Sequence, residues 1–351
     1  MPFICRITAE CSWRVVSRNA GTVLLMARLG KYRKQLGLSA RYFTSSTRGR
    51  RKRDAYIVLL GLSGAWLFAF AHKDNTFKKA STSRYMSFVD KDGAMGTSRE
   101  LGCKGAESYG GVLVLAYGKQ VAGGTRAFGE VTEHYSYKEI LDFTLAYGEG
   151  LKGCSEHDWT VVVATSNYKF AKHTTARTWG KEWADMVNLL DEAGGSRIRY
   201  VGGIDLEPGW GDPEPSMQWL ESYREYALAP LWSNASADGC PLKGAGICAN
   251  GWSTSLMSKA VWDDGGVAVP QIYRTDGVQA AQWANLARIN ANAGGDPRFG
   301  AVMTQGRACR QRYNANCKIL KNKPGDALKQ LNTFLKSTGL SVRYATDIGW
   351  E

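Results

Sequence analysis

The sequence predicts an α/β fold, a (β/α) barrel of the TIM type with eight or slightly fewer regular units. Seven short β-rich runs alternate with six amphipathic segments between residues 111 and 348. Each β-rich run is apolar nearly throughout, as parallel strands covered on both faces are. No Gly-rich phosphate loop follows an early run, which argues against an open nucleotide-binding sheet. A closed barrel with its active site at the carboxyl ends of the strands is therefore expected.

The predicted elements follow from hydrophobic periodicity. The expected strands are Gly111–Gly118, Thr160–Ser166, Ile198–Glu207, Leu228–Asn234, Gly266–Tyr273, Phe299–Gln305 and Leu340–Ile348. The segments between them have apolar residues three and four positions apart, as Trp183, Val187 and Leu190 are, which is the spacing of one helix face. The expected helices are Tyr137–Tyr147, Thr178–Leu190, Ser216–Leu228, Thr254–Trp262, Val278–Asn292 and Asp326–Ser337.

The net charge of +13 on 351 residues lies almost entirely before the barrel. Residues 1–71 hold 13 of the 45 Lys and Arg residues and two of the 32 Asp and Glu residues, which leaves 32 basic and 30 acidic residues in the remainder. A surface that tracks phosphates needs its cations on the folded domain. We therefore expect no nucleic-acid partner.

The N-terminal segment has the pattern of a targeting sequence. The basic run Arg48–Asp54 is followed by the uncharged stretch Ala55–Ala71, which ends in Ala-Phe-Ala, as a secretory signal does. The 17 residues of this stretch are also near the lower limit for one membrane-spanning helix, so an uncleaved anchor is the alternative. The basic flank places the rest of the chain across the membrane in both cases. The protein is then secreted or anchored on the extracytoplasmic side, with membrane contact only through this segment.

These features divide the chain into four parts. Residues 1–47 are a basic N-terminal extension, for which Met26 is an alternative start, and residues 48–71 are the signal peptide or anchor. Residues 72–108 are polar and rich in Gly and Ser, so they are interpreted as a tether that could also supply a first irregular strand. Residues 109–351 form the barrel.

The cysteines agree with export. Six of the eight lie after the leader, and an even number in an exported domain predicts disulfides. Proximity in the sequence pairs Cys240 with Cys248 and Cys309 with Cys317, each across a seven-residue gap, and leaves Cys103 for Cys154. A zinc site is the weaker alternative, since no C-x-x-C occurs and the only histidines are His72, His134, His157 and His173. We expect no metal and no cofactor.

Every predicted strand ends in polar groups, and the central strand ends in two acids. Asp205 and Glu207 are two residues apart, roughly 6.5 Å along a strand, and point to the same face. Buried together, they should titrate as a pair with one pKa raised, which lets a carboxyl act as a general acid near neutral pH. In the alternative interpretation, Asp205 bonds backbone amides and Glu207 is solvated. The other strand ends supply Asn167, Asn234, Gln271, Tyr273, Gln305 and Asp347 as substrate-binding or catalytic candidates.

Several strings resemble a family of uncharacterised exported actinobacterial proteins: VVVATSNY, VGGIDLEPGW, SADGCP with CANGW, VPQIYRTDG, MTQGRAC and RYATDIGW. That family is itself similar to glycoside-hydrolase barrels of the muramidase and chitinase kinds, which carry D-x-E on a central strand. The resemblance implies that Glu207 is the proton donor and Asp205 its electrostatic partner. Muramidase-type barrels also place an acid at the end of the first strand, where this sequence has Ala116 and Tyr117.

The chemistry supports two hypotheses. Glycoside hydrolysis needs an acid and commonly a second carboxylate about 5 to 9.5 Å away, for which Asp205, Asp347 and Asp276 are candidates. A substrate N-acetyl group acting as nucleophile would require only the D-x-E pair. Sugar-stacking platforms are expected among Trp210, Trp252 and Trp350, which follow strands or lie in Gly-rich loops, whereas Trp183, Trp219, Trp262 and Trp283 are expected to pack in the core.

The sequence therefore predicts a monomeric exported glycoside-hydrolase-like enzyme acting on peptidoglycan or another envelope or extracellular polysaccharide. The alternative is a catalytically inactive barrel that binds glycan or has a structural role in the envelope, which the absence of an acid at Ala116 and Tyr117 favours. A Ser-His-Asp hydrolase is not expected, because no G-x-S-x-G motif is present.

Overall fold

Eight parallel strands form a ring in the computed structural model, which describes residues 80–88, 90–106, 108, 110–129, 133–170, 173–312 and 315–350. In ring order the strands are β1 (Ser81–Tyr85), β2 (Gly111–Val121), β5 (Trp159–Ser166), β6 (Ile198–Asp205), β7 (Trp232–Ser233), β8 (Val267–Ala268), β9 (Val302–Thr304) and β10 (Ala345–Trp350). The last strand pairs with the first, and isolated parallel bridges from Ala268 to Phe299 and from Gln271 to Met303 join β8 to the β9 segment. The predicted barrel is confirmed.

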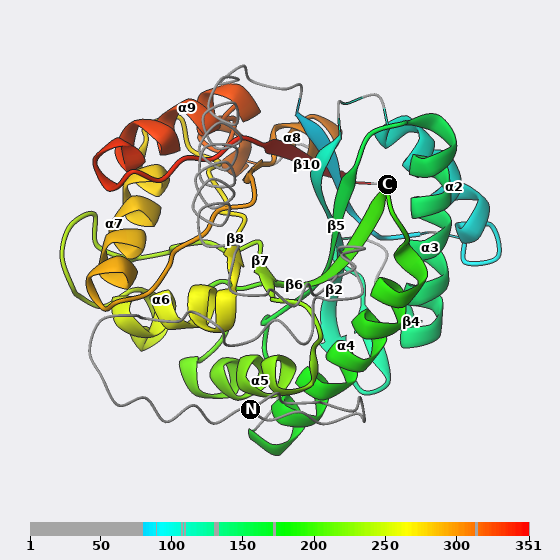
Figure 1. The fold of residues 1–351 in the computed structure, drawn as a ribbon, viewed down its shortest axis with the longest axis horizontal. Helices are drawn as coiled ribbons and strands as arrows, with labels where there is room; N and C mark the ends of the chain where they lie inside the picture. Colours follow the sequence, from blue (N-terminus) through cyan, green and yellow to red (C-terminus); the bar gives the residue numbers. More distant parts are fainter. Residues whose placement is uncertain are drawn as a thin grey trace, which may run out of the picture. The chain divides into compact units, whose positions relative to one another are not determined.

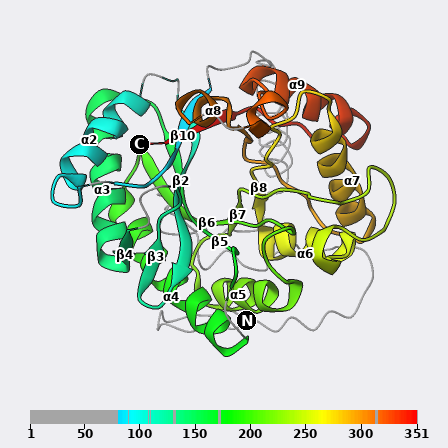
Figure 2. The same cartoon turned by 180° about the vertical axis from the view of Figure 1, so that it is seen from behind.

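The helices lie outside this ring, as Figures 1 and 2 show from opposite sides. They are α2 (Ala94–Gly105), α3 (Tyr137–Cys154), α4 (His173–Gly194), α5 (Pro213–Tyr226), α6 (Thr254–Trp262), α7 (Val278–Asn292), α8 (Gly306–Gln311) and α9 (Pro324–Leu335). Short 3-10 turns occur at Ala249–Gly251, Asp263–Gly265, Ala315–Lys318 and Lys336–Thr338. A small antiparallel extension of β2, formed by β3 (Gly124–Arg126) and β4 (His134–Ser136), precedes α3.

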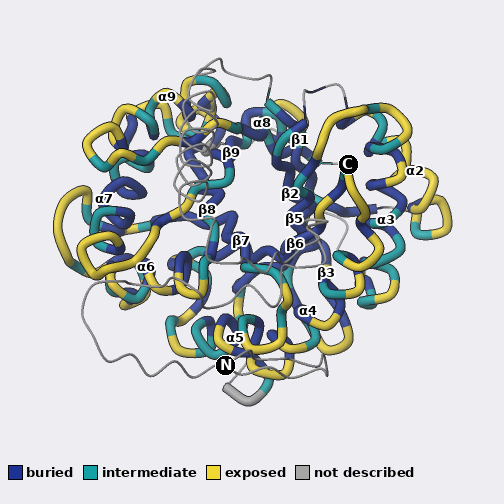
Figure 3. The backbone as a smooth tube through the Cα atoms, viewed as in Figure 1, coloured by how far each residue is buried: buried dark blue, intermediate teal, exposed yellow. Residues whose placement is uncertain are grey.

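Strand alternation separates two layers of core. Inside the ring, alternate residues of the strands pack against one another, among them Val114, Val162, Val201, Val269 and Ile348. Between the strands and the helices lies a larger layer, which contains the four helical tryptophans that were expected there: Trp183, Trp219, Trp262 and Trp283. Figure 3 shows the buried ring of strands and the exposed outer sides of the helices.

The barrel begins earlier than residue 109. Part of the expected tether is the first barrel strand, β1, which pairs with both β10 and β2, followed by α2. The sequence Ser-Thr-Ser-Arg-Tyr has no apolar run, so hydrophobic periodicity does not mark it as a strand. Its inward serine is held by polar contacts instead: Ser83 Oγ lies 2.6 Å from Thr346 Oγ1 and accepts from the Val114 N–H at 2.8 Å.

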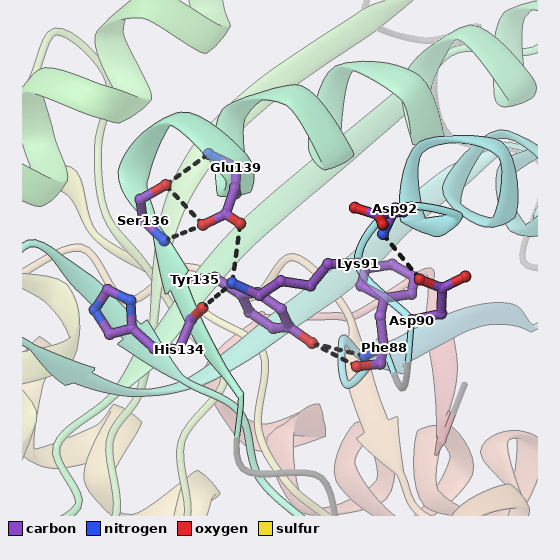
Figure 4. Close-up of polar contacts among 8 residues, drawn as sticks. All are labelled: Phe88, Asp90, Lys91, Asp92, His134, Tyr135, Ser136 and Glu139. Atoms are coloured by element: carbon purple, nitrogen blue, oxygen red, sulfur yellow. Dashed lines mark hydrogen bonds and ion pairs between the residues drawn. The ribbon is translucent and has the colours of Figure 1, made fainter.

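Polar contacts fix the loop that leaves β1, as Figure 4 shows. The Phe88 N–H donates to Tyr135 Oη at 2.7 Å, and Lys91 Nζ bonds to His134 O and to Glu139 Oε1. Glu139 also completes a capping box with Ser136 at the start of α3. The loop after the first strand is thereby joined to the β3–β4 extension, which holds the end of β1 in place.

The three predicted disulfides are confirmed: Cys103–Cys154, Cys240–Cys248 and Cys309–Cys317. The first joins the ends of α2 and α3, and three disulfides are typical of proteins that mature in an oxidising compartment. The proposed extension and signal segment, residues 1–71, lie outside the described residues. Within the described part of the chain, no helix has both the length and the apolar character needed to cross a bilayer.

Candidate active site

Asp205 lies inside the carboxyl end of the barrel, as the last residue of β6. It follows Val201 and Gly203 on the inward face of the strand, and only 4% of its surface is exposed. Gln271 Nε2 donates to Asp205 Oδ1 at 2.7 Å and to the Asn234 carbonyl at 3.1 Å. The predicted candidates Asp205, Asn234 and Gln271 therefore meet at one place, on three consecutive strands of the ring.

Glu207 is half-buried and lies two residues beyond the strand, where the side chain of Asn167 fixes its backbone. The Glu207 N–H donates to Asn167 Oδ1 at 3.0 Å, and Asn167 Nδ2 donates to the Glu207 carbonyl at 3.1 Å. These two bonds continue the pairing of β5 with β6 beyond the strand ends, with the Asn167 side chain in place of a backbone partner. Asn167 is thus a positioning residue for the acid rather than a group open to ligand, since it is fully buried.

The surroundings of the two acids favour their protonated forms. Burial raises the pKa of Asp205 to about 8; the hydrogen bond from Gln271 opposes this, and the charge of Asp238 adds to it. Burial also raises the pKa of Glu207 well above its ordinary range, and the charges of Asp205 and Asp238 raise it further. These surroundings favour a proton on the pair, and a general acid needs a pKa raised in this direction.

Two tyrosines complete the polar cluster. Tyr273, which the sequence analysis named, hydrogen-bonds with Tyr85, the last residue of β1. Burial is the main cause that raises the pKa of both hydroxyls, and the charges of Asp205 and Glu207 contribute, so both tyrosines remain hydroxyl donors. Tyr85 was missed as a site residue because β1 carries no hydrophobic pattern.

Asp238 is a third carboxylate that the sequence analysis did not select. It lies half-buried in the loop after β7, and an ideal Cβ built on Gly209 would be 3.5 Å from its Oδ2. It raises the pKa of both Asp205 and Glu207 through its charge. The sequence signal that could have identified Asp238 is its place in the string Ser-Ala-Asp-Gly, shortly after the predicted strand Leu228–Asn234.

Aromatic rings surround this end of the barrel. Trp210, two residues after Pro208, forms a cluster with Tyr168 and Phe128, with ring centroids 5.6 to 6.3 Å apart. Trp350 stacks on Tyr85 at 4.4 Å, and the guanidinium of Arg312 lies 4.1 Å from the Trp350 ring centroid. Trp210 and Trp350 are both only partly buried, but Tyr85 and Arg312 cover the two faces of the Trp350 ring.

Three predicted candidates lie apart from the acids or inside the core. Asp347 alternates with the inward Ile348, so it faces outward, where Thr304 Oγ1 donates to it at 2.9 Å and Arg310 pairs with it at 3.5 Å. Trp252 is fully buried and donates its indole N–H to the Gly211 carbonyl at 2.9 Å. Gln305 is half-buried at the start of α8.

Asn234 is buried at the inner mouth, and its side-chain amide has no hydrogen-bond partner among the described residues. The hydroxyl of Ser236, two positions further along the same face, is likewise without a partner there. Unpartnered buried polar atoms beside Asp205 are available to a ligand or to water. Within the described ranges, no group of three or more His, Cys, Asp or Glu residues is arranged to hold a metal ion.

The chain is similar to several β-1,4-mannanase structures. A complex of a GH113 β-1,4-mannanase is 12% identical with a TM-score of 0.39, covering 78% of this chain and 88% of that one. The endo-1,4-β-mannanase from Rhizomucor miehei is 9% identical with a TM-score of 0.40, covering 78% and 86%. A further GH113 β-1,4-mannanase structure is 11% identical with a TM-score of 0.41, covering 78% and 88%. No protein-family model and no curated protein matches the chain.

Likenesses at these identities and scores carry no inference about residues or reaction. The resemblance to an exported actinobacterial family stays a prediction.

Proposed function

We propose that this protein is an exported glycoside hydrolase that acts on a cell-envelope or extracellular glycan, with Glu207 as general acid. The observation that carries this proposal is the carboxyl pair of buried Asp205 and half-buried Glu207, whose surroundings favour protonation, at the carboxyl end of a (β/α) barrel. Active sites of such barrels lie at this end. Trp210, which is only partly buried and lies three residues after Glu207, is the aromatic side chain proposed to stack on a pyranose ring.

In the proposed reaction, protonated Glu207 donates its proton to the glycosidic oxygen as the bond to the leaving sugar breaks. The positive charge that develops at the anomeric carbon is stabilised by a carboxylate, for which Asp205 and Asp238 are the two groups close to Glu207. A water molecule from solvent then adds to the anomeric carbon and returns its proton to the Glu207 carboxylate, which completes the hydrolysis. In the variant of this mechanism with substrate assistance, the N-acetyl oxygen of a 2-acetamido sugar attacks the anomeric carbon, and Tyr85 and Tyr273 supply hydroxyl donors beside the carboxyls.

The alternative is a barrel that binds glycan without cleaving it. One observation favours this alternative: β1 is the first strand of the ring, and it ends in Tyr85 rather than in an acid. The strand with Ala116 and Tyr117, first in the sequence prediction, is the second strand of the ring. The position where muramidase-type barrels carry an acid is therefore occupied by a tyrosine.

Turnover and binding measurements on one panel of polysaccharides separate the two functions. Purified full-length protein is incubated with peptidoglycan, chitin and arabinogalactan-type polysaccharides, and released reducing ends are measured for the unmodified chain and for Glu207→Gln. Loss of a general acid is expected to lower turnover by about 100-fold or more. Asp347→Asn is the matched control, because Asp347 is an acid on the outer face of the same barrel.

Release by the unmodified chain and by Asp347→Asn, but not by Glu207→Gln, would support the hydrolase and its acid. If all three proteins bind one polysaccharide and none releases reducing ends, the binding function is correct. Equal release by the unmodified chain and Glu207→Gln would refute the assignment of the acid.

A further inference from the structure

A second polar cavity lies outside the barrel, on the outer face of β1. It has a volume of about 200 Å³ and is bounded by β1, the C-terminal end of α2 with the residue Ser108 that follows it, and α8. Its polar lining consists of Thr82, Arg84, Lys104, Ser108 and Arg307. Water occupies about 30 Å³ in the liquid, so the space exceeds what one water fills. None of the residues of the candidate active site lines this cavity.

Arg84 is the central feature of this cavity. Its neighbours Ser83 and Tyr85 contact the inner side of the ring, so alternation sends Arg84 outward, and only 3% of its surface is exposed. Its Nε has no hydrogen-bond partner, and no acid among the described residues forms an ion pair with it. A buried guanidinium without a counter-charge is costly, and native proteins rarely leave one unpaired.

A glycine brings a second guanidinium toward the same cavity. Gly349 lies opposite Arg84 in the pairing of β1 with β10. An ideal Cβ built on Gly349 would lie 2.8 Å from Cγ and 2.6 Å from Cδ of Arg307, so any side chain there would displace Arg307. The missing side chain lets the stem of Arg307 cross β10 and reach the cavity wall.

Lys104 adds a third cation from α2. Its ion pair with Glu100 is long, at 4.0 Å, and two-thirds of its side chain is exposed. The cavity lining thus contains three cations and two hydroxyls and, among the described residues, no carboxylate. Such a set of donors matches an oxyanion with several oxygens, because Arg binds phosphates through paired N–H groups and Lys as a point charge.

We propose that this cavity binds the tetrahedral oxyanion of phosphate, either as the free ion or as the phosphoryl group of a monoester. The anion neutralises Arg84, and the Thr82 hydroxyl donates to one of its remaining oxygens. The Ser108 hydroxyl can do the same by exchanging its 3.4 Å bond to the Gly105 carbonyl. Because Tyr85 follows Arg84 in the chain and points to the opposite face, the bound anion also stabilises the strand that carries a residue of the candidate active site. The proposal is independent of the reaction proposed above.

The test measures binding of inorganic phosphate to the full chain by isothermal titration calorimetry and by thermal unfolding, with sodium chloride added to keep ionic strength constant. The expected result is saturable binding and a Tm that rises with phosphate concentration. Lys104→Gln and Arg307→Gln remove one charged donor each and are expected to weaken binding by about 10-fold or more. Lys329→Gln, an exposed lysine on α9, is the matched control and should bind as the unmodified chain does.

Arg84→Met gives a second, independent readout. Without phosphate this variant is expected to be at least as stable as the unmodified chain, because a buried unpaired charge is removed. Its Tm should not respond to phosphate. A Tm of the unmodified chain that is independent of phosphate at constant ionic strength would overturn the proposal, and so would an equal response of Arg84→Met.

Glucose 1-phosphate and glycerol phosphate, titrated in the same way, distinguish the two sources of the ligand. Binding of either ester as tightly as inorganic phosphate assigns a phosphorylated molecule to the cavity. Binding of inorganic phosphate alone assigns the free ion. Both results support an oxyanion site. If Lys329→Gln weakens phosphate binding as much as Lys104→Gln, Arg307→Gln and Arg84→Met do, phosphate is attracted nonspecifically to the surface and the proposal is refuted.

Discussion

Replacing Asp205 by Asn should stabilise the fold at neutral and alkaline pH while removing the proposed activity. Asp205 is 4% exposed, and burial raises its pKa to about 8. A carboxyl with a raised pKa in the folded state binds protons more tightly there than in the unfolded chain. The fold therefore loses stability as the pH rises from about 4 to about 8. Asn keeps an oxygen that can accept from Gln271 and carries no charge to be desolvated.

The two pKa values of Asp205 set the size of the effect. An ordinary value of 3.8 and a folded value of about 8, at about 1.4 kcal/mol for each pH unit, give an upper bound of about 6 kcal/mol. Glu207 shares the same surroundings and takes up part of the proton, which reduces what Asp205 alone contributes. We expect Asp205→Asn to gain about 2 to 4 kcal/mol over the unmodified chain at pH 8 and almost nothing at pH 4.

Urea unfolding followed by tryptophan fluorescence, repeated from pH 4 to pH 9, measures this difference. The stability of Asp205→Asn minus that of the unmodified chain should increase steadily with pH. Asp347→Asn serves as control, because Asp347 lies on the outer face and has Arg310 as an ion-pair partner. Parallel stability curves for Asp205→Asn and the unmodified chain would refute the raised pKa of Asp205 in the folded protein.

The remaining predictions concern the cleft, the core and the disulfides. Turnover should fall on the alkaline side as Glu207 loses its proton, so a kcat/KM that stays constant up to pH 10 would contradict a general acid with a raised pKa. Trp252→Phe should lower the free energy of unfolding by about 1 to 3 kcal/mol, because it removes a buried hydrogen bond and leaves a gap. Trp210→Phe should change the free energy of unfolding by less than about 0.5 kcal/mol yet weaken glycan binding in affinity electrophoresis. A larger loss of stability in Trp210→Phe than in Trp252→Phe would contradict a buried Trp252 and a partly exposed Trp210. Thiol titration of the denatured, unreduced chain should find at most the two thiols of Cys5 and Cys11, and more would contradict the three disulfides.

Much of the barrel could be predicted because its strands and helices are marked by periodicity. The helices Thr254–Trp262 and Val278–Asn292 have the predicted bounds, and every predicted strand contains one or more residues of an observed strand. A first irregular strand was expected within residues 72–108, but its bounds could not be predicted, because Ser81, Ser83 and Thr346 replace apolar packing with hydrogen bonds between strands that lie far apart in the sequence. Local sequence patterns contain no information about such partners.

The candidate site could be predicted in part for the same reason. Alternation along one strand was enough to place Asp205 inward, and proximity was enough to pair the cysteines. The prediction included Glu207 in that strand, whereas the strand ends at Asp205. The positions of the other candidate residues depend on strand register and on segments without a periodic pattern. Asp347 lies on the outer face because it neighbours the inward Ile348, whereas Tyr85 and Asp238 enter the site from segments without a periodic pattern.

Closure of the ring by β1 and β10 has a consequence for how the protein folds. Thr346 Oγ1 donates to the Ser81 carbonyl, and these two residues are 265 positions apart in the sequence. Contacts between positions so far apart form slowly during folding. During synthesis, β1 is complete long before its partner exists and exposes an unpaired edge until β10 emerges. Ring closure is then expected to be a late step in folding, and premature termination before Ala345 would leave β1 and β9 each unpaired on the edge that β10 covers.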